Sequence, residues 1–313
     1  MTTGLNYAQY VTQIATMAVV SETDSAFQNI LTQMITYSEN RMYRDLDFLF
    51  TSGSSTAYSL TAGSRVLNVN AETFPYGTLV VPEQINVITP AGTSNPDSGN
   101  RVPLLPTTKE FLDACYGSGL SANRSVPQYW VPFDDYTFLV GPYPDASYSV
   151  EIVGTYRPQS LGYLPPVSSA SSGGTIVFSA AHGLFTGDTI TLYNFAPSGW
   201  NASFVVTVTN STTVIVSTSA TTATTIGTAA SAGSTTFISL NLPDIMIMAS
   251  MIYISAYQRN FGRANDDPQM AITYESQYQA LLKSAMVEES RKKFEAAGWS
   301  SQSPSPVATP TRG

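Results

Sequence analysis

A long stretch almost free of charge constrains the fold most. Residues 167–234 contain no lysine, arginine or glutamate, and Asp188 is their only acidic residue. Serine, threonine, valine, isoleucine, glycine and alanine dominate instead, a composition that favours short strands over helices. Turn residues separate four strand-like runs, at 175–178, 189–192, 204–208 and 214–216. We predict a small all-β module, a barrel or an immunoglobulin-like fold, inserted at 165–236 between flexible hinges at Ser168–Gly174 and Ser231–Gly233.

Both ends of the chain have the periodicity of helices. Apolar residues recur every three to four positions in four segments, 7–17, 27–42, 245–257 and 270–285. Ser21-Glu22-Thr23-Asp24 has the pattern of a helix cap at Ser21 with an acidic residue three positions on, and Pro243 and Asp267 suit the start of the third and fourth helices. The third segment is apolar almost all round, which predicts burial on most faces, and Gly262 is expected to end it. We expect these helices to pack as one cluster.

Residues 52–156 change to short β-rich runs separated by proline and glycine. They predict an antiparallel sheet region, one short helix near Thr107–Ala114 and a tight hairpin at Pro144-Asp145-Ala146. The fold class is therefore α+β, a helical bundle with an antiparallel β region and an inserted all-β module. Three domains are predicted. They are a core at 1–164 with 237–299, an inserted module at 165–236, and a flexible arm rich in serine and proline at 300–313.

The low content of charged residues and the negative net charge limit which kinds of partner the protein can bind. Charged residues make up 12% of the chain, about half the usual share of roughly 25%, which suits a surface covered by neighbouring subunits. The 22 acidic and 14 basic residues give a net charge of −8, which argues against a protein that grips phosphates. A passage through which DNA slides without sticking stays compatible. We see no secretory signal or membrane span, and we expect a soluble protein kept in a cytoplasm.

No catalytic or metal-binding constellation can be assembled from the sequence. The single histidine, His182, and the single cysteine, Cys115, are interpreted as structural, with Cys115 a small buried residue. Asp134-Asp135 is predicted to be an exposed turn and Asp267 a helix cap, rather than metal ligands. We therefore predict no enzyme activity and no cofactor.

The candidate interaction residues are basic positions on the helices and residues of the arm. They are Arg41, Arg44, Arg291, Lys292, Lys293, Ser300, Pro304, Pro306, Pro310 and Arg312. The basic residues lack interleaved aromatic residues that would stack nucleic-acid bases. They are either solvated helix faces or contacts with a neighbouring subunit. Glu288 with Lys292 and Glu289 with Lys293 are predicted to pair at i,i+4.

Several short motifs stand in order along 5–163 and 238–300. They are Asn6-Tyr7 with Ile14-Ala15, Tyr37–Leu46, Ile85–Pro90, Val140–Asp145, Gly154–Pro158, Leu240–Asp244, Tyr257–Gly262 and Tyr274–Tyr278. No single motif is diagnostic, but their order in a helix–sheet–helix layout resembles the head-to-tail adaptor (connector) proteins of tailed bacteriophages, especially short-tailed ones.

The resemblance implies a structural virion protein at the head–tail junction, assembled in the host cytoplasm. It implies a homo-oligomer, a dodecameric ring beneath the portal protein that extends the DNA channel, passes genomic DNA non-specifically and docks tail tube, nozzle or fibre proteins. It also implies an extension at the C-terminal end that reaches toward the portal.

The insert departs from the family pattern. Ala181–Leu184 and Gly187–Ile190 look like a small β module found in phage structural proteins, where it decorates or docks, and we expect it on the outer side of the ring. The alternative function is a peripheral tail-fibre or receptor-binding protein, suggested by the Ser/Thr-rich module. The lack of long repeats and the helical ends argue against that alternative.

Overall fold

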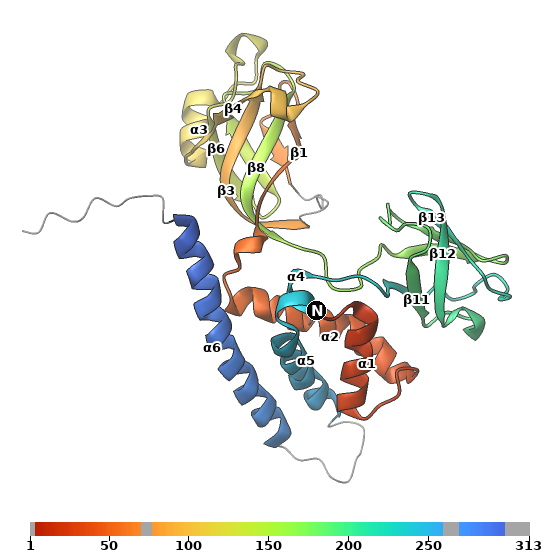
Figure 1. Ribbon diagram of the computed structural model, residues 1–313. Helices are drawn as coiled ribbons and strands as arrows, with labels where there is room; N and C mark the ends of the chain where they lie inside the picture. The colour runs from red at the N-terminus through yellow and green to blue at the C-terminus, as the bar shows by residue number, and fades with distance from the viewer. Residues whose placement is uncertain (1–3, 70–76, 259–268, 298–313) are drawn as a thin grey trace, which may run out of the picture. The chain divides into compact units, whose positions relative to one another are not determined.

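The computed structural model describes residues 4–69, 77–258 and 269–297 (Figure 1). The chain divides into two compact units, which we call unit 1 (residues 1–49 and 160–313) and unit 2 (residues 50–159). Within the described residues there are six α-helices and several antiparallel sheets, so the protein is mixed α+β as predicted. The predicted division into core, inserted module and arm stays a prediction.

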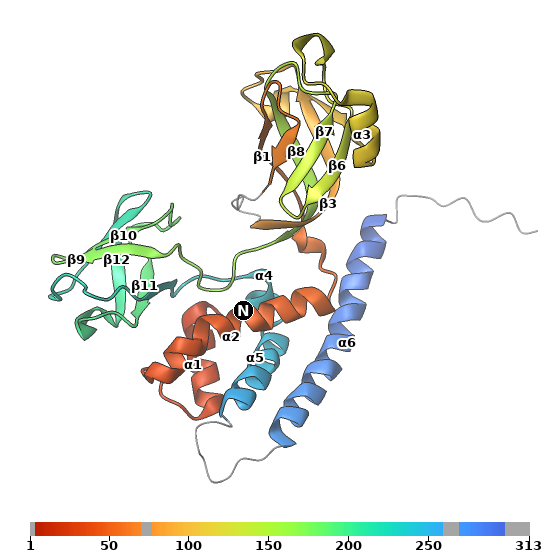
Figure 2. The same ribbon diagram turned by 180° about the vertical axis from the view of Figure 1, so that it is seen from behind.

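The helices of unit 1 form where the apolar periodicity predicts them. They are α1 (Tyr7–Ala18), α2 (Ser25–Asp45), α5 (Pro243–Gln258) and α6 (Gln269–Ala297), with a short additional helix, α4 (Phe237–Asn241). Helix α5 packs against α1, α2 and α6, and Figure 2 shows it from behind beside α2 and α6. Every residue from Ile245 to Ser255 is at least partly buried, which confirms the prediction from its all-round apolar sequence.

The helix caps agree only partly with the prediction. Helix α1 begins with a capping box between Asn6 and Gln9. Helix α2 is capped by Asp24, whose carboxylate accepts a 2.9 Å hydrogen bond from the Phe27 amide, so the predicted cap at Ser21 is wrong. Ser21 instead bonds Thr23 within the preceding turn. The predicted helix boundaries at Gly262 and Asp267 lie outside the described residues.

One buried polar cluster joins three of these helices. The Tyr10 hydroxyl of α1 is hydrogen-bonded to the Ser250 hydroxyl of α5. The same Ser250 oxygen lies 2.8 Å from the Ser38 hydroxyl of α2. All three side chains are fully buried. Because a buried polar group is costly unless it is paired, this cluster favours one register among the three helices.

Unit 2 consists of two sheets that share a core. Among its described residues, the first sheet has the strand order β1-β8-β3-β4 and the second has the order β2-β7-β6-β5. The bounds are β1 (Ser52–Leu60), β2 (Val66–Asn68), β3 (Thr78–Thr89), β4 (Asn100–Pro103), β5 (Leu105–Pro106), β6 (Tyr129–Asp134), β7 (Thr137–Gly141) and β8 (Tyr148–Arg157). Ile85, Val150 and Phe138 lie in the core. Helix α3 (Lys109–Tyr116) covers β6 and β7 through Leu112.

Two predictions for unit 2 are wrong. The turn near Pro144 is not a hairpin, because it leads from β7 in one sheet to β8 in the other, where β8 pairs with β1 and β3. The hairpin turn lies instead at Asp135-Tyr136, between β6 and β7, and Asp134 is the last residue of β6. Asp134 and Asp135 are both exposed, as predicted. Cys115 is exposed rather than buried, because Leu112 occupies the core-facing side of the short helix α3.

The low-charge segment folds as a six-stranded antiparallel sheet, and all of its residues are described. Its order is β14-β11-β12-β13-β10-β9. The bounds are β9 (Val167–Ser171), β10 (Thr175–Phe178), β11 (Thr189–Tyr193), β12 (Ser203–Asn210), β13 (Thr213–Val216) and β14 (Thr228–Ser231). The four predicted strands are all present. Trp200, Ile176 and Ile190 are fully buried in a core of this segment's own.

The predicted first hinge is an ordered β-turn region rather than a flexible linker. Residues of β9 pair with β10, and Ala170, opposite Ile176, is buried. Gly173 and Gly174 both have positive φ, +87° and +83°, and turn the chain from β9 into β10. The second predicted hinge is also ordered, since Ser231 ends β14 and the Ala232 amide donates to the Thr189 carbonyl. Small residues therefore serve here for close packing and tight turns, not flexibility.

The two glycines of the turn offer a matched test. A Cβ at Gly174 would lie 1.8 Å from the Val216 carbonyl oxygen, whereas a Cβ at Gly173 would meet nothing within 4 Å. We expect Gly173→Ala to cost about 1–2 kcal/mol from its left-handed φ alone. We expect Gly174→Ala to cost about 3 kcal/mol or more, because the backbone must also move. Native-state hydrogen exchange of the β10 amides measures both losses, and equal losses in the two variants would contradict the close approach.

Candidate functional site

A buried carboxylate joins the two chain segments that border the six-stranded sheet. Glu39 lies on the core side of α2 and is 2% exposed. Its carboxylate accepts hydrogen bonds from the Leu161 amide at 3.2 and 3.3 Å and from the Thr236 hydroxyl at 3.4 Å. Leu161 lies just before the sheet and Thr236 just after it. One side chain therefore holds both segments against α2.

The backbone around Glu39 reinforces the same junction. The Ser231 amide donates to the Gly162 carbonyl at 3.0 Å, so the segments leading into and out of the sheet are directly paired. The amides of Tyr7 and Ala8, at the start of α1, donate to the carbonyls of Ser234 and Ala232 at 3.0 and 3.1 Å. The chain returns to the helices at the place where it left them, and we call this region the Glu39 junction.

The Glu39 junction makes the Glu39 carboxyl a weaker acid than an ordinary glutamate. Burial raises the pKa of the Glu39 carboxyl to about 7, although hydrogen bonds from Ser160, Leu161 and Thr236 act to lower it. The desolvation of the carboxylate thus outweighs the three hydrogen bonds. The sequence did carry a signal for this residue, since Glu39 stands four positions after Ile35 and three before Met42, within the apolar stripe of α2.

The structure places the predicted interaction residue Arg41 in an internal network between α2 and α6. Its guanidinium donates to Glu275 at 2.6 Å and lies 4.2 Å from the centre of the Tyr278 ring. The Tyr278 hydroxyl donates to Asp45 at 2.7 Å. Burial lowers the pKa of Arg41, but the hydrogen bond to Glu275 outweighs this and leaves it raised. Arg41 therefore stabilises the packing of α6 on α2.

Lys292 is also engaged within unit 1. Its ammonium lies 3.1 Å from Glu288, which confirms that predicted pair, and 2.7 Å from Glu289. Glu289 is buried, accepts from the Leu49 amide at 3.4 Å and bonds Lys292 at i,i+3. The structure does not describe the side chain of Lys293, so its predicted pairing with Glu289 stays untested. Lys292 is therefore held by carboxylates of its own helix rather than left free in solvent.

The other predicted interaction residues are not gathered into one site. Arg44 is exposed and donates to the Asn40 carbonyl at 3.1 Å, and Arg291 is exposed on α6. Ser300, Pro304, Pro306, Pro310 and Arg312 lie outside the described residues.

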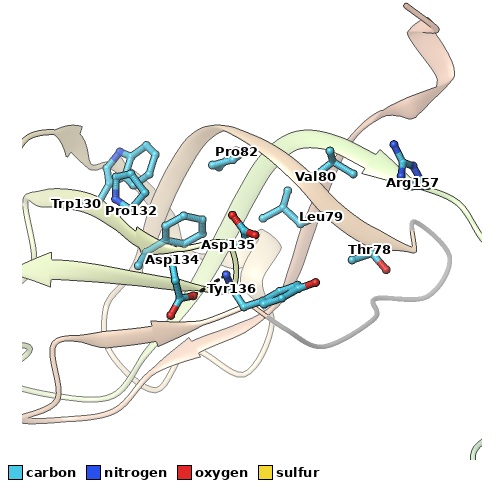
Figure 3. Close-up of a pocket in the computed structure, with 11 residues that line it drawn as sticks. Thr78, Leu79, Val80, Pro82, Trp130, Pro132, Asp134, Asp135, Tyr136 and Arg157 are labelled. Atoms are coloured by element: carbon cyan, nitrogen blue, oxygen red, sulfur yellow. Dashed lines mark hydrogen bonds between the residues drawn. The ribbon is translucent and has the colours of Figure 1, made fainter. Parts of the chain in front are cut away.

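Unit 2 carries a groove between the start of β3 and the β6–β7 hairpin (Figure 3). Its volume is about 650 Å³. Its lining is mostly apolar, with acidic residues at the hairpin and one arginine: Thr78, Leu79, Val80, Pro82, Trp130, Pro132, Asp134, Asp135, Tyr136, Phe138 and Arg157. Sequence reasoning missed this groove, because its two walls come from strands that are far apart in the chain.

The described residues offer few candidates for a catalytic or metal-binding site. They hold no group of three or more histidine, cysteine or acidic residues that could bind a metal ion. His182 is buried, its Nδ1 accepts from the Leu184 amide at 2.9 Å and its Nε2 lies 3.0 Å from the Asn210 carbonyl. Both ring nitrogens are thus used by the backbone, in keeping with the structural role predicted for this histidine. Within the described chain no helix is long and apolar enough to cross a membrane.

The chain matches the model of a known family. The model of the family described as SU10 adaptor protein matches residues 5–177. The matched segment includes α1, α2 and all of unit 2, and it passes the predicted boundary at residue 165 to include β9 and most of β10. The segment 238–300, which carries the later resemblance motifs, lies outside the match. No curated protein matches the chain.

The raised pKa of Glu39 predicts that the stability of unit 1 falls as the pH rises. Between the ordinary glutamate pKa of 4.5 and about 7, the folded protein keeps a proton that the unfolded chain has released. We expect a loss of about 2–3 kcal/mol from pH 5 to pH 8 in the wild-type protein. Glu39→Gln keeps an acceptor for the Leu161 amide and should remove this slope. Urea unfolding followed by helical circular dichroism measures both profiles.

Glu275→Gln is the matched control for Glu39→Gln. The hydrogen bond from Arg41 lowers the pKa of Glu275, so its contribution to stability is lost only as the pH falls below about 4.5. The control should therefore shift the whole profile between pH 5 and 8 without changing its slope. A wild-type profile that is flat over this range would contradict the prediction.

Proposed function

The chain belongs to the SU10 adaptor protein family, and from that premise we propose that it forms the dodecameric head-to-tail adaptor ring of a short-tailed phage. Membership of the family makes it a phage adaptor protein of the virion. The proposal adds that the ring lies beneath the portal, extends the DNA channel and docks tail tube, nozzle or fibre proteins. The role is structural and involves no enzyme activity.

The family match is the observation that carries this proposal. It covers more than half of the chain and includes both N-terminal helices and the whole of unit 2. The helical part of unit 1 supports a mechanical role, because α1, α2 and α5 share one buried polar cluster and α6 is tied to α2 by Arg41. Such packing resists bending of one helix against another.

The charges support passage of DNA rather than binding to it. The net charge is −8, and several cations are paired with carboxylates of the same chain: Arg41, Arg65, Arg101, Lys109 and Lys292. A basic residue neutralised in this way contributes little to counterion release on a phosphate backbone. A duplex would slide past such a surface without strong attachment.

The six-stranded sheet is proposed as the docking or decorating element on the outer side of the ring. Its residues 167–234 have Asp188 as their only charged side chain, and Val205 and Ile215 are exposed on neighbouring strands. An uncharged surface of threonine, serine and valine suits contact with another protein surface more than contact with an ion or a nucleic acid.

A cryo-electron microscopy reconstruction of the phage particle tests the ring. A short tag inserted beside Phe185, which is 77% exposed, marks the sheet without touching its core. We expect twelvefold copies of the chain in a collar directly beneath the portal, with the tag at its outer radius. Copies at the tail periphery with threefold symmetry would contradict the adaptor role and favour a fibre or receptor-binding protein.

Removal of residues 300–313 tests the arm. We expect the shortened protein to bind the portal at least about tenfold more weakly, because the arm would contribute contacts of its own, worth about 1.4 kcal/mol per tenfold change. Its thermal unfolding should stay within a few degrees of the wild type, because the described contacts of both units do not involve these residues. Surface plasmon resonance against purified portal protein measures the first effect. Unchanged portal binding would remove the arm from the proposal.

A further inference from the structure

The groove of unit 2 exposes apolar surface to solvent. Leu79, Trp130 and Phe138 are buried at its floor. Val80 and Tyr136 at its walls are 47% and 52% exposed. Removing such surface from water is favourable, so an apolar side chain of a partner that enters the groove is stabilised there.

The charged side chains lie at the two ends of the groove. Figure 3 shows the exposed carboxylate of Asp135 turned toward the groove at the hairpin end. Asp134 beside it turns back and accepts a 2.8 Å hydrogen bond from the Tyr136 amide. Arg157 lines the other end. The groove therefore suits an apolar group with a cation next to it, placed so that the cation meets Asp135.

A loop of unit 2 has this chemistry. Residues 117–124, which we call the Leu120 loop, follow α3, and the Leu120 side chain is 70% exposed. The other residues of the loop before Asn123 are glycine, serine and alanine, so no bulky neighbour shields Leu120. The Asn123 amide donates to the Leu120 carbonyl at 2.9 Å, and the following Ser125 amide donates to the Tyr143 carbonyl at 3.0 Å. The projection is thus preformed and loses little entropy on docking.

Arg124 supplies a cation at the base of the Leu120 loop. Its Nε donates to the Gly119 carbonyl at 2.9 Å. Its guanidinium packs against Gly63, where a Cβ would lie 2.7 Å from the arginine Cζ. Among the described residues no carboxylate is paired with Arg124, whereas two other arginines of unit 2 are paired with carboxylates. The loop therefore presents an apolar side chain near an uncompensated positive charge, in complement to the groove.

The Leu120 loop and Asp135 lie at opposite ends of unit 2. The loop is tied to Tyr143, which follows the end of β7, whereas Asp135 lies in the hairpin where β7 begins. The six residues of β6 put about 20 Å between these two ends. The lining of the groove contains no residue of the loop. The loop that fits a given groove therefore belongs to a second copy of the chain.

We propose that the Leu120 loop of one copy docks in the unit 2 groove of a second copy. Leu120 packs on Trp130 and Phe138 of that second copy. The Arg124 guanidinium pairs with the Asp135 carboxylate. Because each copy offers one loop and one groove, the contact is heterologous and joins copies head to tail, as a ring requires. The inference rests on the proposed assembly of copies and deepens it by naming one contact between neighbours.

Photo-crosslinking between two kinds of full chain tests the contact. A ¹⁵N-labelled chain with p-benzoylphenylalanine in place of Tyr136 is mixed with the unlabelled wild-type chain. The mixture is held at about 1 mM, at which even a contact with a millimolar dissociation constant forms. Illumination should join the labelled peptide around position 136 to unlabelled residues 117–124, as identified by mass spectrometry.

A matched position on the same strand is the control. Phe133 is 59% exposed on β6 but does not line the groove, so p-benzoylphenylalanine in its place should give no such adduct. The proposal fails if position 136 gives no adduct to the loop or if position 133 gives as much. It also fails if the adducts join only labelled peptides, because the loop would then come from the same kind of chain alone.

Loss of the leucine tests the apolar part of the contact. We expect Leu120→Ser in the unlabelled chain to lower the adduct yield about tenfold or more, because a leucine side chain is no longer buried on docking. Leu120 is exposed in the single chain, so its replacement should leave the fold intact. Leu105→Ser removes a leucine that is 58% exposed on β5 outside the groove and should leave the yield unchanged. Equal yields from the two variants would contradict the docking of Leu120.

Charge reversal on two different chains identifies the ion pair. Asp135→Lys in the labelled chain, or Arg124→Glu in the unlabelled chain, should lower the yield about twofold to fivefold, as for a pair that is not fully buried. Mixing the two variants should restore the yield, and only a contact between chains can do so. Glu110→Lys in the labelled chain makes the same charge change on α3 and should restore nothing. Failure of the mixture to restore the yield would remove the pairing of Arg124 with Asp135.

The outcome is separable from that of the proposed function, because the mixture contains neither portal nor DNA. A twelvefold collar in the particle with no adduct between chains would keep the ring and reject this contact. An adduct between chains with threefold copies at the tail periphery would keep the contact and reject the adaptor ring.

Discussion

The burial of one carboxylate, Glu39, sets how the helices of unit 1 connect to the six-stranded sheet. Its oxygens accept hydrogen bonds from the Leu161 amide and the Thr236 hydroxyl, which lie before and after the segment of about 70 residues that forms the sheet. Desolvation of a carboxylate is unfavourable, so the arrangement persists only where several donors converge on it. The start of α1, the pairing of Gly162 with Ser231 and the cap of α4 all meet at this point. The sheet is therefore anchored at its base.

That anchorage alters how the sheet relates to the rest of the chain. A freely hinged insert would leave its flanking residues solvated, but Ala232 is buried and the Tyr7 and Tyr193 hydroxyls are hydrogen-bonded to each other. The family match also continues through β9 and into β10 instead of stopping at residue 165. The first strands of the sheet thus share the sequence pattern of the adaptor family. The contacts at the Glu39 junction also give no reason to place a domain boundary at residue 165.

Local patterns predicted the elements well and their partners poorly. The apolar stripes fixed four helices, and the all-round apolar α5 is buried as expected, because helical contacts are set within a few residues. The strands of the low-charge segment were also foreseen, but the turn at Pro144 indicated only a reversal of the chain. The chain passes at this turn from the sheet of β7 to the sheet of β8, because β8 pairs with β1 and β3, which come much earlier in the chain. The groove was hidden for the same reason, and Glu39 was overlooked because a polar residue in an apolar stripe was not counted as a signal.

The placement of charge connects the fold to the adaptor role. Arg41 and Lys292 were candidates for outward contact, yet each lies among carboxylates and an aromatic ring within unit 1. Two of the 14 basic residues thus tie α6 to α2 and to α4, and Arg65, Arg101 and Lys109 are paired with carboxylates in unit 2. Pairing of this kind lowers the long-range attraction of these five cations for a negatively charged surface. In the proposed role, in which nucleic acid passes through a ring of these chains, weak attraction to phosphate is an advantage, since each contact with a phosphate would slow the passage.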